Sequence, residues 1–195
     1  MALDYIEYYT YEDYKNWEGD WELIEGHPVA MAPAPVIKHQ SIATKIAAQL
    51  EMSIQECEEY DVVMEEDYKI SDDTIVRPDV SFICDKNSES YIIKPPLIIA
   101  EIISPSTIYK DERVKFELYE KEGVKYYILV YPEDLRAKIF KNSENGFKKI
   151  GDFFTETFCF EDIACKPCID FARVFKKWRT NRHETQRQIH NDHQK

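Results

Sequence analysis

The chain has 195 residues, of which 44% are hydrophobic and 13% aromatic, and this composition indicates a globular protein and excludes a disordered one. The formal net charge of −12 disfavours a nucleic-acid partner, because proteins bind nucleic acids largely by neutralising phosphates. No apolar run reaches the ~20 residues that span a bilayer, and the acidic start MALDYIEYY lacks the features of a secretory signal, so we expect a cytoplasmic protein without a membrane partner.

Three elements are predicted in the first part of the chain. Thr10 and Asp13 have the spacing of a capping box, which predicts a short helix through Trp17 that ends at Gly19. The segment WELIEGHPVAMAP is typical of a hairpin, because two short apolar runs flank a turn. The clearest helix follows, since its apolar residues keep helical spacing; they are Ile42, Ala43, Ile46, Ala47, Leu50, Ile54 and Cys57.

Three strands are predicted next, followed by a helix, a fourth strand and a hairpin. The three strands are DVVMEEDYKI, IVRPDVSFIC and LIIAEIIS. The helix extends from about Tyr109 to Glu122, and Gly123 ends it. The fourth strand is KYYILVYP, and the hairpin joins RAKIFK to GFKKIGDFF. This order predicts an α/β or α+β domain in which helices cover a mixed central sheet.

An acidic residue, Glu101, interrupts the apolar strand LIIAEIIS, and a buried carboxylate is costly unless it has a partner. Side-chain alternation brings Asp79 to the same place if the two strands are neighbours. Pro78 cannot donate a ladder hydrogen bond, so we expect an edge or a distortion there. Two such carboxylates either form an ion pair, with Arg77 or Lys115, or bind a hard cation such as Mg²⁺.

The helix after this strand has Asp111, Lys115 and Tyr119 at intervals of four residues, which predicts one stripe on its surface. A partly exposed Lys115 that is directed at the carboxylates could position a water molecule or stabilise charge on a phosphate. The alternative is a solvated lysine with an acidic neighbour. The stripe alone does not distinguish the two.

Taken together, these segments resemble the PD-(D/E)XK nuclease superfamily, and more closely its Uma-two family of restriction-endonuclease-like proteins. The resemblance rests on RPDV, on the glutamate of AEIISPST after 21 intervening residues, and on KDERVKFELYEKEGVKYYILVYP. The segments WELIEG, KHQ and ISDDTIVRPDV fit the same pattern, so the resemblance extends from about Thr10 to Phe175. It implies a restriction-endonuclease-like core with an N-terminal helix–hairpin addition.

The resemblance also implies a function: a hydrolase, specifically an endonuclease that cuts DNA phosphodiester bonds with Mg²⁺ or Mn²⁺, and that works as a homodimer. Asp79, Glu101 and the backbone carbonyl of Ile102 would bind the metal. The superfamily's Glu-x-Lys lysine would stand where this chain has Ile103, and Lys115 is the expected catalytic substitute. If catalysis is lost with that lysine, the alternative is a degenerate nuclease fold that acts as a nucleic-acid-binding or interaction module. A two-carboxylate glycosidase is disfavoured, because no aromatic sugar platform is identifiable.

Further residues have two interpretations each. Glu22 is either a further metal or water ligand or an acid on the hairpin surface, and His39 either touches phosphate or substrate or is simply exposed. Tyr119 belongs with them as a second-tier residue. Glu66 has the parity of an inward-facing acid, but a one-residue shift gives that role to Glu65.

We expect one domain over residues 1–178 and a polar, partly basic tail over residues 179–195. From Arg173 to Lys195 there are seven lysines and arginines against two acidic residues, which is typical of either a DNA-binding arm or a disordered end. The chain has five cysteines, an odd number, and no fourth zinc ligand accompanies Cys159, Cys165 and Cys168 at a recognisable spacing. We therefore expect free thiols rather than disulfides.

Overall fold

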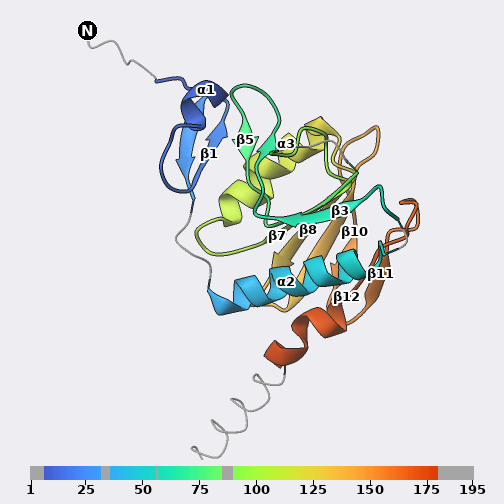
Figure 1. Ribbon diagram of the computed structural model, residues 1–195. Coiled ribbons are helices and arrows are strands. Elements are labelled where there is room, and N and C mark those ends of the chain that lie inside the picture. Colours follow the sequence, from blue (N-terminus) through green and yellow to red (C-terminus); the bar gives the residue numbers. More distant parts are fainter. Residues whose placement is uncertain (1–6, 32–35, 56, 85–89, 180–195) are drawn as a thin grey trace, which may run out of the picture.

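A six-stranded mixed sheet forms the centre of the molecule in the computed structural model, which describes residues 7–31, 36–55, 57–84 and 90–179 (Figure 1). The strand order is β10-β9-β8-β7-β6-β3. Strands β7 and β8 are parallel and the other neighbours are antiparallel. The strands are β3 (Asp61–Met64), β6 (Val80–Ile83), β7 (Ile98–Ile102), β8 (Tyr126–Tyr131), β9 (Arg136–Lys141) and β10 (Lys148–Phe153).

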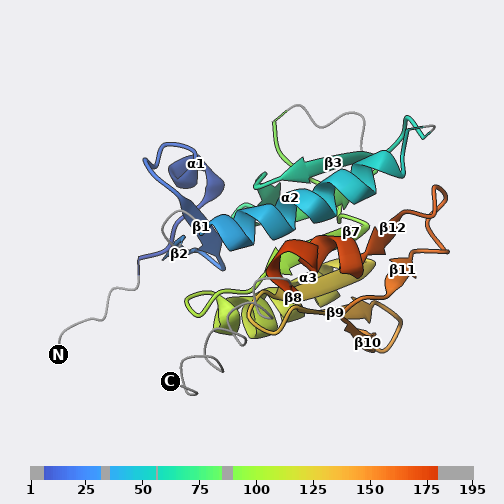
Figure 2. The same cartoon turned by 90° about the horizontal axis from the view of Figure 1, so that it is seen from below.

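Helices cover both faces of this sheet: α2 (Ile37–Met52) lies on one side and α3 (Lys115–Glu122) on the other (Figures 1 and 2). Alternate residues of β7 divide between the two faces. Ala100 packs in the same core cluster as Ile46 of α2, whereas Ile99 packs with Tyr119 of α3. Burial on both faces explains why the central strands are continuous apolar runs in the sequence.

A smaller four-stranded sheet, in the order β2-β1-β5-β4, forms the N-terminal addition. The predicted hairpin is confirmed, and the predicted capping box between Thr10 and Asp13 is present. The helix that it opens, α1, packs on this sheet through Tyr14, against Leu23 and Ile75. The elements are α1 (Tyr11–Tyr14), β1 (Trp21–Ile24), β2 (His27–Ala30), β4 (Tyr68–Lys69) and β5 (Ile75–Val76).

Two of the predicted strands are each divided between the two sheets. DVVMEEDYKI forms β3 and β4, with the left-handed Glu65 (φ 53°) between them, and IVRPDVSFIC forms β5 and β6. The distortion predicted at Pro78 is confirmed, but β6 is not an edge strand, because it lies between β7 and β3. Asp79 therefore stands where the chain leaves the small sheet and enters the central one.

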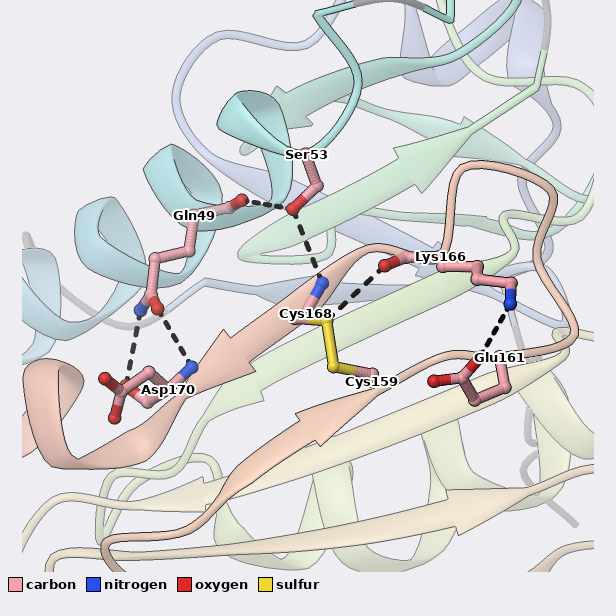
Figure 3. Close-up of a disulfide and its surroundings, with 7 residues drawn as sticks. All are labelled: Gln49, Ser53, Cys159, Glu161, Lys166, Cys168 and Asp170. Carbon is pink, nitrogen blue, oxygen red and sulfur yellow. Dashed lines mark hydrogen bonds and ion pairs between the residues drawn. A yellow bond between two sulfur atoms is a disulfide. The ribbon is translucent and has the colours of Figure 1, made fainter.

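A C-terminal segment that the sequence did not predict packs beside α2. It consists of β11 (Thr157–Cys159), β12 (Cys168–Asp170) and helical residues 171–179. Gln49 of α2 and Ser53, which caps that helix, bind the backbone of β12, as Figure 3 shows: the Asp170 N–H donates to Gln49 Oε1 at 2.9 Å, and the Cys168 N–H donates to Ser53 Oγ at 3.4 Å. Of the predicted basic arm, Arg173–Arg179 are helical, and residues 180–195 lie outside the described part of the chain.

The expectation of free thiols is wrong for four of the five cysteines. Cys57 is bonded to Cys165 and Cys159 to Cys168, while Cys84 is free and exposed. Cys57 and Cys165 are 108 residues apart in sequence. Cys159 of β11 and Cys168 of β12 lie opposite each other in the antiparallel pair of strands. These partners depend on the fold and not on local spacing, so the CxxC motif gave no indication of them.

The helices of the described residues are all too short or too polar to cross a membrane.

Candidate active site

Asp79 and Glu101 lie side by side, as strand alternation predicted. The antiparallel register pairs Val80 with Ala100, and its continuation by one residue places Asp79 opposite Glu101. The backbone N–H of Ile102 donates to Asp79 Oδ2 at 2.6 Å, and the N–H of Asp79 donates to Glu101 Oε2 at 3.4 Å. Each carboxylate is thus oriented by the backbone of the other's strand.

Lys115 lies on Glu101, but it is not the partly exposed helix lysine that we expected. Its side chain is 3% exposed, and its Nζ lies 2.9 Å from Glu101 Oε1 and 2.8 Å from Glu22 Oε1. The same ammonium group donates to the backbone carbonyl of Arg77 at 3.4 Å. Its three N–H donors therefore all have protein partners.

Glu22 is fully buried, so its interpretation as an acid on the hairpin surface is wrong. Besides Lys115, it binds the Nζ of Lys110 through Oε2, and it accepts a hydrogen bond of 2.9 Å from the backbone N–H of Arg77. Burial by itself would raise the pKa of Glu22, but the charges of Lys115 and Lys110 outweigh it and lower that pKa to about 2. The small sheet thus brings a stable anion to the central sheet.

For Glu101 the effect of burial on the pKa exceeds the effect of the nearby positive charge. Burial raises its pKa well above the ordinary value, with Lys115 opposing this effect and Asp111 and Asp79 reinforcing it. The pKa of Asp111 is raised too, chiefly by burial. For Lys115, burial works to lower the pKa, but the surrounding carboxylates raise it well above its ordinary value. The lysine is therefore charged, while the carboxylates around it still compete for positive charge.

The second-tier residues Tyr119 and His39 both contact this pair of acids. The hydroxyl of Tyr119 donates to Glu101 Oε1 at 3.1 Å, and burial raises the pKa of that phenol well above its usual range. His39 is not simply exposed: its Nε2 lies 3.3 Å from Asp79 Oδ2, and its side chain is 13% exposed. Burial acts to lower the pKa of His39, but Asp79, Glu65 and the backbone of Ile102 together raise that pKa above its ordinary value.

Asp79, Glu101, Lys115 and His39 line a cavity of about 340 Å³, a volume typical of ligand sites, whereas Tyr119 and Glu22 lie behind its wall. Of the two neighbouring glutamates considered for an inward-facing acid, Glu65 lines the cavity and Glu66 does not. The lining residues with acidic, basic or hydroxyl side chains include Asp79, Glu101, Lys115, Asp111, Lys110 and Ser106.

The donor chemistry of this cavity fits a hard divalent cation. The described part of the chain contains no group of three or more His, Cys, Asp or Glu side chains that could hold a metal ion by themselves. The predicted set is smaller, two carboxylates and the carbonyl of Ile102, and Mg²⁺ usually retains several water ligands. The pKa values of Glu101 and Asp111 stay raised beside Lys115, so the lysine does not fully compensate these acids, and a bound cation would add to its effect.

Sequence reasoning missed Lys110, and the reason is a local change in helix geometry. The predicted helix begins as a π-helix, η1 (Lys110–Val114), before α3 begins at Lys115. The stripe of Asp111, Lys115 and Tyr119 was predicted from α-helical spacing alone, and no local sequence signal announces a π-turn. The predicted end is confirmed, because Gly123 adopts the left-handed conformation (φ 83°).

The comparisons with known proteins agree on the fold. The Uma2 family model, described as "Putative restriction endonuclease", matches residues 7–156. A crystal structure from Anabaena variabilis, described as "a putative nuclease belonging to DUF820", covers 86% of this chain and 97% of its own, with a TM-score of 0.70. The two are 16% identical, so this likeness shows the fold alone.

Two other results add no argument about function. A structure described as a DrdV–DNA complex aligns with 58% of this chain and 12% of its own chain, at 14% identity and a TM-score of 0.31. A search of curated proteins finds no match.

Proposed function

Because the chain belongs to the Uma2 family of restriction-endonuclease-like proteins, we propose that it is an endonuclease that hydrolyses DNA phosphodiester bonds with Mg²⁺ or Mn²⁺. The observation that supports this most directly is the meeting of Asp79, Glu101 and Lys115 at one wall of the cavity. Two acids and a lysine are the parts that the superfamily uses, and Lys115 here reaches Glu101 from a different element than position 103.

The metal would be held by Asp79, Glu101 and the carbonyl of Ile102. When bound, it would lower the pKa of a water molecule and neutralise charge on the phosphate. Lys115 and Tyr119 both bind Glu101 Oε1, and this fixes the carboxylate and leaves Oε2 on the side of Asp79.

Two residues hold this set in place. His39 contacts Asp79 Oδ2 and so limits the rotation of that carboxylate. Glu22 shares Lys115 with Glu101, which keeps the lysine charged and fixed. We therefore assign Asp79 and Glu101 to the catalytic set, and Lys115, Glu22, His39 and Tyr119 to its positioning.

The alternative is a catalytically degenerate nuclease fold that acts as a nucleic-acid-binding or interaction module. One observation favours it: the Lys115 ammonium group has no donor left for a substrate. Ile103, at the position of the superfamily lysine, packs in the apolar cluster on the α3 face and offers no replacement.

The test is to incubate the purified protein with supercoiled and single-stranded DNA in Mg²⁺, in Mn²⁺ and in EDTA. We expect cleavage that requires the metal and disappears in Glu101→Gln. The matched control is Glu117→Gln, which makes the same change at an exposed position of α3 and should cleave like the wild type. DNA binding without cleavage in either metal would support the degenerate module instead.

We also propose that the protein acts as a homodimer, because cutting both strands of a duplex requires two sites. Light scattering coupled to size-exclusion chromatography measures this directly. A monomer at all concentrations that support cleavage would contradict it.

A further inference from the structure

We propose that Lys110, and not Lys115, is the lysine that binds a phosphate of the DNA substrate. This inference rests on the proposed function and names the residue that contacts the substrate there. It follows from a comparison of the two lysines that share Glu22.

Lys115 is poorly placed to bind a substrate. Its ammonium group donates to Glu22, to Glu101 and to the Arg77 carbonyl, and the residue is 2% exposed. A phosphate could replace one of these partners only by leaving a buried carboxylate or carbonyl without its hydrogen bond, which is unfavourable. The contacts of Lys115 instead hold the carboxylates.

Lys110 has the properties that Lys115 lacks. Its ammonium group makes one hydrogen bond within the described residues, to Glu22 Oε2, so two of its three N–H donors are left. Its side chain is 17% exposed and lines the cavity. The Lys110 ammonium group can therefore donate its remaining N–H groups to an anion while it keeps its hydrogen bond to Glu22.

The π-helix explains how Lys110 reaches this position. In an α-helix, residues five apart point in directions that differ by about 140°. In η1 the backbone N–H of Lys115 donates to the carbonyl of Lys110, an i→i+5 bond that places residues five apart above one another. As a result the two lysines bind the two oxygens of Glu22. Single π-turns of this kind are rare in proteins, and many of those that occur lie at functional sites.

The surroundings of Lys110 also suit a phosphate. The hydroxyl-bearing residues Ser104, Ser106 and Thr107, in the segment that follows β7, line the same cavity. Lysine ammonium groups and serine or threonine hydroxyls are common partners of DNA phosphate oxygens. A cation is needed at this point, because the adjacent wall is formed by Asp79 and Glu101, which repel an anion.

The test measures DNA binding in a Glu101→Gln background, where cleavage is prevented. The probe is a short fluorescein-labelled duplex, and anisotropy gives the affinity over a range of NaCl concentrations in Mg²⁺. Loss of one phosphate contact reduces the slope of log K against log[salt] by about 0.9, which corresponds to roughly 5- to 10-fold weaker binding near 0.1 M salt. We expect this result for Lys110→Met, while Lys110→Arg retains most of the slope.

The matched control is Lys121→Met, which removes the same charge from an exposed position of α3 and should leave the slope unchanged. An unchanged slope in Lys110→Met, with circular dichroism showing a folded protein, would overturn the assignment and leave the proposed function intact. A reduced slope of log K against log[salt] in Lys115→Met but not in Lys110→Met would show that Lys115, and not Lys110, contacts the phosphate. Absence of DNA binding by the wild type and all variants would overturn both proposals.

Discussion

Replacing Lys115 by methionine should destabilise the protein as strongly as breaking a buried ion pair does. The lysine is 2% exposed and is the shared partner of Glu101 and Glu22. Removal of one partner from a buried pair typically costs about 3–5 kcal/mol, because the remaining charge is uncompensated. Methionine fills a similar volume, so the loss reports on charge and not on a cavity.

The structure narrows this range to its lower end and predicts its pH dependence. Glu22 keeps Lys110 and the Arg77 N–H, so the loss falls mainly on Glu101, which keeps Tyr119 and the Asp79 N–H. Glu101 can escape an uncompensated charge by taking up a proton, and its pKa is already raised by burial. The loss should therefore be about 3 kcal/mol at neutral pH and smaller in acid, where a neutral Glu101 needs no cation.

Urea denaturation followed by circular dichroism measures this at pH 7.5 and pH 5. A double-mutant cycle with Glu101→Gln isolates the pair, and Lys115→Met should cost less in that background. The control Lys121→Met should stay within about 0.5 kcal/mol of the wild type. A loss in Lys115→Met below about 1 kcal/mol, the range of exposed ion pairs, would refute the reasoning.

Three further variants test other parts of the structure. Glu22→Gln should remove about 3 kcal/mol of stability above pH 4.5, because the folded pKa is about 2; the difference from the wild type should vanish as the pH falls toward 2 in acid titrations. Asp111→Asn should raise the melting temperature at pH 7, because burial raises the pKa of Asp111, and the gain should disappear below pH 3.8; a loss at pH 7 would contradict this. Cys57→Ser should lower stability by about 2–5 kcal/mol, since the disulfide joins residues 108 apart, whereas Cys84→Ser should have little effect in the same melts.

Much of the fold was predictable because its elements are locally encoded. Apolar spacing located α2, continuous apolar runs located β7 and β8, and Gly123 marked the end of α3. The meeting of Asp79 and Glu101 was predictable too, because antiparallel neighbours with known parity leave few registers.

What the sequence did not reveal depends on tertiary contacts. The burial of Glu22 requires the small sheet to pack beside η1, and alternation within a four-residue strand cannot show this. The Cys57–Cys165 disulfide joins segments whose proximity is set by the packing of β11 and β12 on α2. The role of Lys110 depends on the π-helix η1, which the α-helical spacing of the apolar and charged residues does not reveal.

The placement of a glutamate inside an apolar strand has a physical explanation in the junction of the two sheets. The chain crosses from β5 to β6 through Arg77 and Pro78, and this opens the ladder beside Glu101 at the point where Lys115 and Glu22 approach. One lysine cannot satisfy all the carboxylates there, because Glu101 and Asp111 keep raised pKa values while Glu22 has a lowered one. In a protein selected only for stability, apolar residues in place of the whole buried set of Glu22, Lys115 and Glu101 would serve at least as well. The buried acids at this junction are therefore better explained by the proposed function, in which a bound cation would compensate them.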